Sequence, residues 1–162
     1  MFTRNKGAVA VFSLSKFAAT FIMLLWCSAS IHEWFHLTAT QMLGGNGYIV
    51  RSLFHGGGSV KFTVVPSDPT LVAFAGGLGV ALVFGILMLL DWIAFDTSGA
   101  AAILPIVLSQ LGYGIVEGLF FFNMTRSQFN DISLPVMVIC YGVGLVISLV
   151  WVVRDVVNRY YA

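Results

Sequence analysis

Four long apolar stretches dominate the pattern of hydrophobic and polar positions along the chain. They cover about residues 17–42, 70–92, 100–122 and 134–153. Each reaches the length of roughly 20 residues that a helix needs to cross a lipid bilayer. The pattern therefore predicts an all-α membrane protein, in which residues 1–162 form a single domain with four transmembrane helices. An even number of spans places both chain termini on the same side of the membrane.

The segments between these stretches differ in character. The first linker is rich in glycine and alternates between apolar and polar residues at 48–53 and 59–65. This alternation predicts a β-hairpin or a pair of short strands between the first two helices. Because unpaired strand backbone cannot face lipid, we expect the strands at the membrane interface or against other parts of the protein. Residues 123–133, with the sequence NMTRSQFNDIS, are predicted to form a polar loop before the last helix.

Composition supports a multi-pass integral membrane protein. Hydrophobic residues make up 59% of the chain and charged residues only 9%, whereas a soluble domain is roughly 25% charged. The chain lacks the charged side chains that would cover a soluble surface, so a lipid bilayer is its expected surrounding. The net charge of +1 argues against nucleic-acid binding, which requires a basic surface.

The first apolar stretch contains the sequence HEWFH at residues 32–36. On a helix, His32 and His36 lie on one face, so both imidazoles can bind one metal ion. Glu33 beside them is placed to take a proton from a metal-bound water. Three ionisable residues within five positions of a spanning helix are costly to bury, which favours a functional reading. The alternative is a helix end that emerges from the membrane, with both histidines hydrogen-bonded to neighbours.

A catalytic zinc ion needs a third protein ligand, and the sequence leaves several candidates. The metzincin motif is not continued, since Ala39 and Met42 stand where its Gly and third His would be. His55 in the first linker is one candidate. Glu117, inside the third apolar stretch, could be a ligand, a hydrogen-bond partner of a ligating histidine, or a neutral acid bonded to a neighbouring helix. Asp131, just before the last apolar stretch, is the remaining candidate.

Three separated stretches resemble the site-2 protease family of intramembrane zinc metalloproteases, in the family's order. HEWFH and the LTATQMLGGNG that follows it resemble the family's HExxH helix and its Gly-rich end. Residues 55–83 resemble the Gly-Gly strand segment and the helix that opens with Ala-Gly-Pro. FFNMTRSQFNDIS resembles a Phe-Asn…Leu-Asp-Gly stretch, whose Asn and metal-binding Asp are eight residues apart, as Asn123 and Asp131 are here. The resemblance spans roughly residues 23–150.

The resemblance implies a zinc site and a segment that binds substrate. Carried over residue by residue, His32, His36 and Asp131 would bind Zn2+, and Glu33 would be the general base. Substrate contacts would come from His55, Gly56, Gly57, Gly58 and Asn123. We favour Asp131 over Glu117 as the third ligand, because its spacing agrees and a loop can bend to meet the helix. Glu117 is kept as the alternative ligand or as a partner of a ligand.

The chain departs from the family pattern at four positions. Gly77 replaces a Pro, Val80 replaces the usual Asn, and Ile132 and Ser133 replace the Gly-Gly after the aspartate. These departures affect two features of the family pattern: the groups that position the substrate, and the residues around the third zinc ligand. They leave the HEWFH residues intact.

The main functional hypothesis is an intramembrane zinc endopeptidase that hydrolyses peptide bonds in or near transmembrane segments of membrane-protein substrates. The substrate would pair as an extended strand with residues 48–65. The alternative is an inactive or divergent accessory subunit that keeps a zinc site within a larger complex of membrane subunits, which the small size and the departures favour. A transporter or proton-relay subunit that uses Glu117 is a weaker alternative, because the four stretches show no internal repeat.

Overall fold

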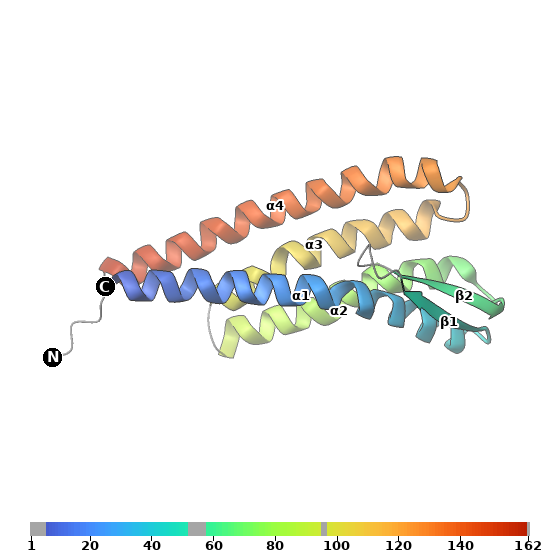
Figure 1. The fold of residues 1–162 in the computed structure, drawn as a ribbon, viewed down its shortest axis with the longest axis horizontal. Helices are drawn as coiled ribbons and strands as arrows, with labels where there is room; N and C mark the ends of the chain where they lie inside the picture. Colours follow the sequence, from blue (N-terminus) through green and yellow to red (C-terminus); the bar gives the residue numbers. More distant parts are fainter. Residues whose placement is uncertain (1–5, 52–57, 95–96, 162) are drawn as a thin grey trace.

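The computed structural model describes residues 6–51, 58–94 and 97–161 and is an elongated bundle of helices with a small sheet at one end (Figure 1). In chain order, the elements are α1 (Lys6–Met42), β1 (Asn46–Arg51), β2 (Gly58–Val64), α2 (Pro69–Ala94), α3 (Thr97–Phe120) and α4 (Arg126–Tyr161). The four predicted helices and the predicted strand pair between the first two are all present, so the predicted fold class is confirmed. The start of α1 and the end of α4 lie at the same end of the bundle.

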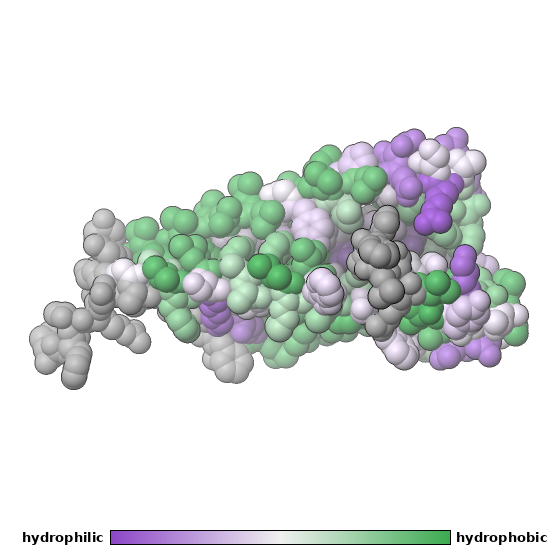
Figure 2. Space-filling model, in the orientation of Figure 1, coloured by the Kyte–Doolittle hydropathy of each residue, from purple (hydrophilic) through white to green (hydrophobic). Residues whose placement is uncertain are grey.

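Each helix contains a stretch that is long and apolar enough to cross a membrane. These stretches are Ala10–Met42, Pro69–Ile93, Ser98–Phe120 and Arg126–Asn158. Figure 2 shows hydrophobic residues over most of the visible face, while hydrophilic residues gather mainly at the end that carries the α3–α4 turn and the sheet. An apolar surface of this extent is consistent with a multi-pass membrane protein whose helices contact lipid.

α3 is the central helix of the bundle. It packs against α1, α2 and α4, and 56% of its most apolar stretch is buried, against 11% in α1 and 17% in α4. Two buried apolar clusters involve it, the first made of Phe17, Ala101, Ala102 and Val152 and the second of Val80, Phe84, Ile103 and Ile106. A polar side chain on an inward face of α3 is therefore held away from lipid.

α2 and α3 approach each other closely because glycine faces glycine. A Cβ atom at Gly77 would lie 2.4 Å from the Cα of Gly114, and one at Gly114 would lie 2.8 Å from the backbone nitrogen of Leu78. α3 and α4 also approach closely at a single glycine, since a Cβ at Gly144 would lie 2.6 Å from the Cα of Pro105. Small residues at such crossings let helix backbones pack tightly in a membrane.

Two helices extend further than the hydrophobic pattern predicts. α1 begins at Lys6 rather than near residue 17, and α4 begins at Arg126 rather than near residue 134. Thr125 caps α4 through two reciprocal hydrogen bonds with Gln128. The Thr125 backbone N–H donates to Gln128 Oε1 (3.0 Å), and the Gln128 backbone N–H donates to Thr125 Oγ1 (3.4 Å). This capping box starts the helix before its apolar stretch begins. The predicted loop at 123–133 is therefore wrong, because most of it forms the first turns of α4.

The chain turns from α1 into the sheet through a glycine cap. Gly44 has a φ of 74°, its N–H donates to the Gln41 carbonyl (3.1 Å), and the Gly45 N–H donates to the Thr40 carbonyl (2.9 Å). This pattern is a Schellman motif, which needs a left-handed residue that glycine adopts without strain. β1 and β2 then pair as antiparallel strands and pack against α1. The sheet lies beside the half of α1 that carries HEWFH (Figure 1).

Candidate metal centre

His32 and His36 point into the bundle from one face of α1, one helical turn apart. Both side chains are buried, and their Nε2 atoms lie 2.9 Å from each other. The four-residue spacing of the histidines in HEWFH predicts this shared face, and the structure confirms it. The two rings are therefore placed to bind the same ion.

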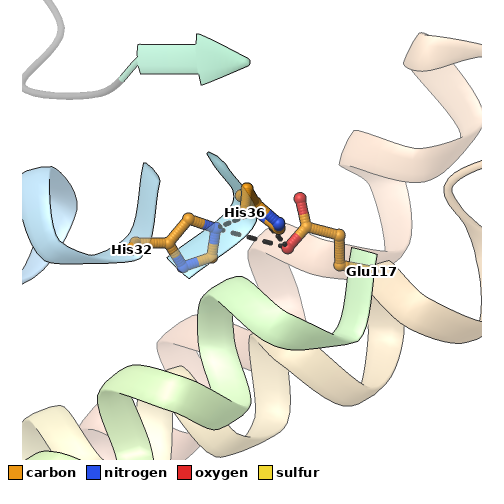
Figure 3. A group of neighbouring side chains, drawn as sticks. All are labelled: His32, His36 and Glu117. Atoms are coloured by element: carbon orange, nitrogen blue, oxygen red, sulfur yellow. Dashed lines mark hydrogen bonds and ion pairs between the residues drawn. The ribbon is translucent and has the colours of Figure 1, made fainter. Parts of the chain in front are cut away.

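Glu117 of α3 completes a group of three side chains. Its Oε2 atom lies 3.3 Å from the Nε2 atom of each histidine, and Figure 3 shows the three side chains pointing toward one another from α1 and α3. All three residues are buried, and their ligand atoms lie within 4.8 Å of one another. The group could therefore hold a metal ion between the first and third helices.

Asp131 is not part of this group. Our preference for it assumed a flexible loop, but Asp131 lies within α4, which begins at Arg126, and its side chain is exposed. A helix sets the direction of each side chain, so Asp131 stays at the surface instead of bending toward HEWFH. The structure brings Glu117, the alternative candidate, and not Asp131 beside His32 and His36.

Hydrogen bonds behind the histidines determine which ring nitrogens face the centre. The Nδ1 atom of His36 donates to the backbone carbonyl of Val72 (2.6 Å). The Nδ1 atom of His32 lies 3.0 Å from the side-chain carbonyl oxygen of Gln110. Because a carbonyl oxygen can only accept, each Nδ1 carries a ring proton, and in the neutral ring Nε2 then keeps a free lone pair. Metal-binding histidines are held by this kind of hydrogen bond.

Hydrogen-bond acceptors meet at the centre of this group, and when both rings are neutral none of them can donate a hydrogen bond to another. In neutral rings with the proton on Nδ1, both Nε2 atoms are acceptors, as is the carboxylate of Glu117. Within the described residues, Glu117 Oε2 is buried and has no hydrogen-bond partner. Three acceptors this close in a buried place repel one another unless a proton or a metal cation lies between them. Two imidazoles and one carboxylate form a donor set that divalent metal ions accept, so these residues fit a metal ion.

Glu33 lies beside the group but is not one of its three members. Its side chain is buried and lies against Gly58, the first residue of β2, where an added Cβ would be 3.0 Å from the Glu33 Cγ. Glu33, His36, Gly58 and Glu117 all line one cavity of about 500 Å³. The acid next to the histidines therefore faces space in which a substrate can lie.

α2 covers the centre from a third side, through a residue that sequence reasoning missed. A Cβ atom at Gly76 would lie 2.3 Å from the Nε2 of His36 and 2.6 Å from that of His32. Only a residue without a side chain fits there. The signal in the sequence is the Gly-Gly pair at 76–77, which is ambiguous because glycine also serves ordinary helix packing.

Gln110 is the second residue that sequence reasoning missed. It lies two turns before Glu117 on α3, so the two polar residues share one helix face. A polar pair at this spacing within an apolar stretch is a signal that could have indicated an inward-facing site.

The predicted substrate contacts have different outcomes. His55, Gly56 and Gly57 fall within residues 52–57, outside the described residues, whereas Gly58 lines the cavity. Asn123 lies just after α3 with its side chain exposed, where Nδ2 donates to the Leu119 carbonyl (3.2 Å). The described cavity lining contains Asn130 instead of Asn123.

No family model matches the chain, and no curated protein or solved structure matches it either. The resemblance to the site-2 protease family stays a hypothesis that rests on three stretches of sequence.

Proposed function

We propose that this chain is an intramembrane zinc endopeptidase that hydrolyses peptide bonds in or near transmembrane segments of membrane-protein substrates. The observation that carries the proposal is the buried group of His32, His36 and Glu117, with Glu33 beside it at the wall of a cavity. Two histidines and a glutamate, with a fourth position open, are a ligand set of zinc peptidases. The four apolar helices around the group support a site of action within the membrane.

The spacing of the three ligand atoms supports zinc as the metal. Zinc bonds of about 2.0–2.1 Å in a tetrahedral site place two ligand atoms about 3.3 Å apart. The observed separations are 2.9 Å between the Nε2 atoms and 3.3 Å from each of them to Glu117 Oε2. His32, His36 and Glu117 would hold the ion, and the open position would face the cavity.

Each side chain has a separate role in the proposed reaction. When bound, zinc supplies a Lewis acid that polarises the scissile carbonyl and makes a water molecule more acidic. Glu33 takes a proton from the attacking water and transfers it to the departing amine nitrogen. Gly58 packs against the Glu33 side chain, and Gln110 and Val72 orient the two histidine rings.

The sheet supports the proposal that the substrate lies in an extended form. Residues 58–62 of β2 line the same cavity as Glu33, and among the described residues β2 pairs on one side only, with β1. A peptide segment with its backbone along β2 would pass close to Glu33. Extended backbone is also the form in which a peptide bond is accessible, because a helical substrate hides its carbonyls in hydrogen bonds.

Loss of cleavage in Glu33→Gln is the direct test of this function. Native and variant protein, both purified in detergent with zinc, are incubated with solubilised membrane proteins, and new peptide N-termini are identified by mass spectrometry. We expect new N-termini with the native protein only, and equal zinc content in the two samples. Cleavage that persists in Glu33→Gln would rule out Glu33 as the base.

The alternative function, an accessory subunit that keeps a zinc site, is favoured by the outer surface of the bundle. α1 and α4 are mostly unburied, and Trp26 of α1 is 85% exposed. Neighbouring membrane subunits could cover these faces as well as lipid does. Stoichiometric co-purification with other membrane proteins, without Glu33-dependent cleavage, would favour this alternative.

A further inference from the structure

The cavity beside Glu33 extends well beyond the candidate centre. It lies between β2 and the turn that joins α3 to α4. Its outer part is lined by large apolar side chains, namely Phe62, Phe121, Phe122, Met124 and Phe129. The outer part of the cavity therefore suits apolar side chains larger than alanine or glycine.

Aromatic rings connect this outer part to the metal centre. Tyr113 packs edge-on against His32, with ring centres 5.4 Å apart, and Phe129 packs against Tyr113 at 6.0 Å. Phe121 continues the row, 5.4 Å from Phe129. Edge-to-face contacts of this kind hold the rings as one wall. A substrate side chain next to the scissile bond would lie against that wall.

Two cations line the same cavity. Lys61 comes from β2 and Arg126 is the first residue of α4, and both are exposed. The amino end of α4 adds a partial positive charge next to Arg126. Apart from Glu33 and Glu117 at the centre itself, the described lining contains no acidic residue. The outer part of the cavity therefore attracts negative charge.

We propose that the outer cavity is a binding subsite for a peptide segment with a large apolar side chain next to acidic residues. The proposal deepens the proposed function, on which it rests, by naming the class of substrate. Such a segment occurs where an apolar span continues into an acidic flank. A peptide fits better than an anionic lipid, because the backbone of β2 and the proton-transfer residue Glu33 line the same space.

A binding experiment tests this inference without requiring cleavage. Glu33→Gln protein in neutral detergent is titrated with two fluorescent decapeptides that share a Phe-Leu core, one flanked by Asp and Glu and the other by Lys. Fluorescence anisotropy should show the acidic peptide binding about fivefold more tightly at low salt, as expected for two exposed ion pairs. The preference should fade in high salt, which screens exposed charges.

Charge reversal identifies the residues responsible. In the Glu33→Gln background, Lys61→Glu combined with Arg126→Glu should remove or invert the preference. Arg154→Glu is the matched control, because Arg154 is an exposed cation of α4 near the opposite end of the bundle and should leave the preference unchanged. Phe121→Ala should weaken binding of both peptides alike, because it removes part of the apolar wall.

Three outcomes would overturn the inference. Equal affinity for the two peptides is the first, and a preference that survives the double charge reversal is the second. The third is that dilute phosphatidylglycerol displaces the acidic peptide, and that native mass spectrometry detects this lipid bound to the Glu33→Gln protein but not to the double charge-reversal variant. That result would make the cavity a lipid site. Failure of the proposed function is seen separately, as absence of Glu33-dependent cleavage by the native protein.

Discussion

At the scale of single residues, the chemistry of the candidate centre depends on what lies behind the two histidines. The Val72 carbonyl is backbone and would hold His36 whatever side chain stood at position 72. The partner of His32 is a side chain, that of Gln110. A substitution at Gln110 can therefore disturb the orientation of the His32 ring while His32, a candidate ligand, stays in place.

Gln110→Leu should weaken zinc binding. Leucine fills a similar volume but cannot accept the Nδ1 proton of His32, so the ring is free to turn or to change its protonated nitrogen. Loss of such a partner weakens metal affinity by about 10- to 100-fold, which competition with a chromophoric chelator would measure. Gln41→Leu, at an exposed position near the end of α1, is the control and should bind zinc as the native protein does.

Gly76→Ala should disrupt the centre more severely. Its Cβ would lie within 2.6 Å of Nε2 atoms of both histidines, so either the rings or α2 must move. We expect zinc binding to be lost, as measured by elemental analysis. Gly85→Ala, in the same helix with nothing within 4 Å of the new Cβ, should keep zinc and gain slightly in stability. Normal zinc content in Gly76→Ala would contradict the described packing of α2 over the histidines.

Sequence reasoning named all three candidate ligands, but it preferred Asp131 to Glu117 as the third. His32 and His36 could be predicted to share a face because their relation depends only on helix periodicity, a local property. The third ligand depends on which face of α3 meets α1, a tertiary relation that no local pattern contains. Asp131 was favoured on the assumption of a loop, and that assumption failed when Thr125 and Gln128 capped a helix.

At the scale of helices and strands, the length of each apolar stretch predicted that a helix is present, but not where the helix begins and ends. All four helices could be predicted because each carries about 20 apolar residues. The ends of the helices could not be predicted, because the hydrophobic pattern marks only the part of a helix that suits lipid. The helix itself can continue into polar sequence. α1 and α4, at 37 and 36 residues, exceed their predicted lengths for this reason. The strand pair was predictable from alternation and glycine-rich flanks.

Gly114→Ala should destabilise the contact between α2 and α3. The added methyl group would lie 2.8 Å from the backbone of Leu78 and 2.9 Å from that of Gly77, so the helices must separate. Overpacking of this kind costs about 1–3 kcal/mol, which thermal unfolding in detergent would detect as a lower midpoint. Gly142→Ala on α4, where the new Cβ meets nothing within 4 Å, is the control and should not lower the midpoint.

At the scale of the whole molecule, the arrangement of helices explains how charged groups can be buried in an apolar bundle. α3 lies at the centre, so Glu117 reaches the histidines of α1 while it stays buried inside the bundle. The sheet and the α3–α4 turn lie on the polar side of the same centre, as the hydrophilic end in Figure 2 indicates. The proposed substrate path therefore leads from the polar end of the bundle to the metal centre.

The zinc content of the purified protein tests the central claim most directly. Elemental analysis would compare the native chain with Glu117→Gln and Asp131→Asn, substitutions that keep size and remove charge. We predict about one zinc ion per chain in the native protein and in Asp131→Asn, and loss of zinc in Glu117→Gln, since a structural or catalytic zinc needs at least three protein ligands. Zinc that is retained in Glu117→Gln but lost in Asp131→Asn, or a native protein without zinc, would contradict the account.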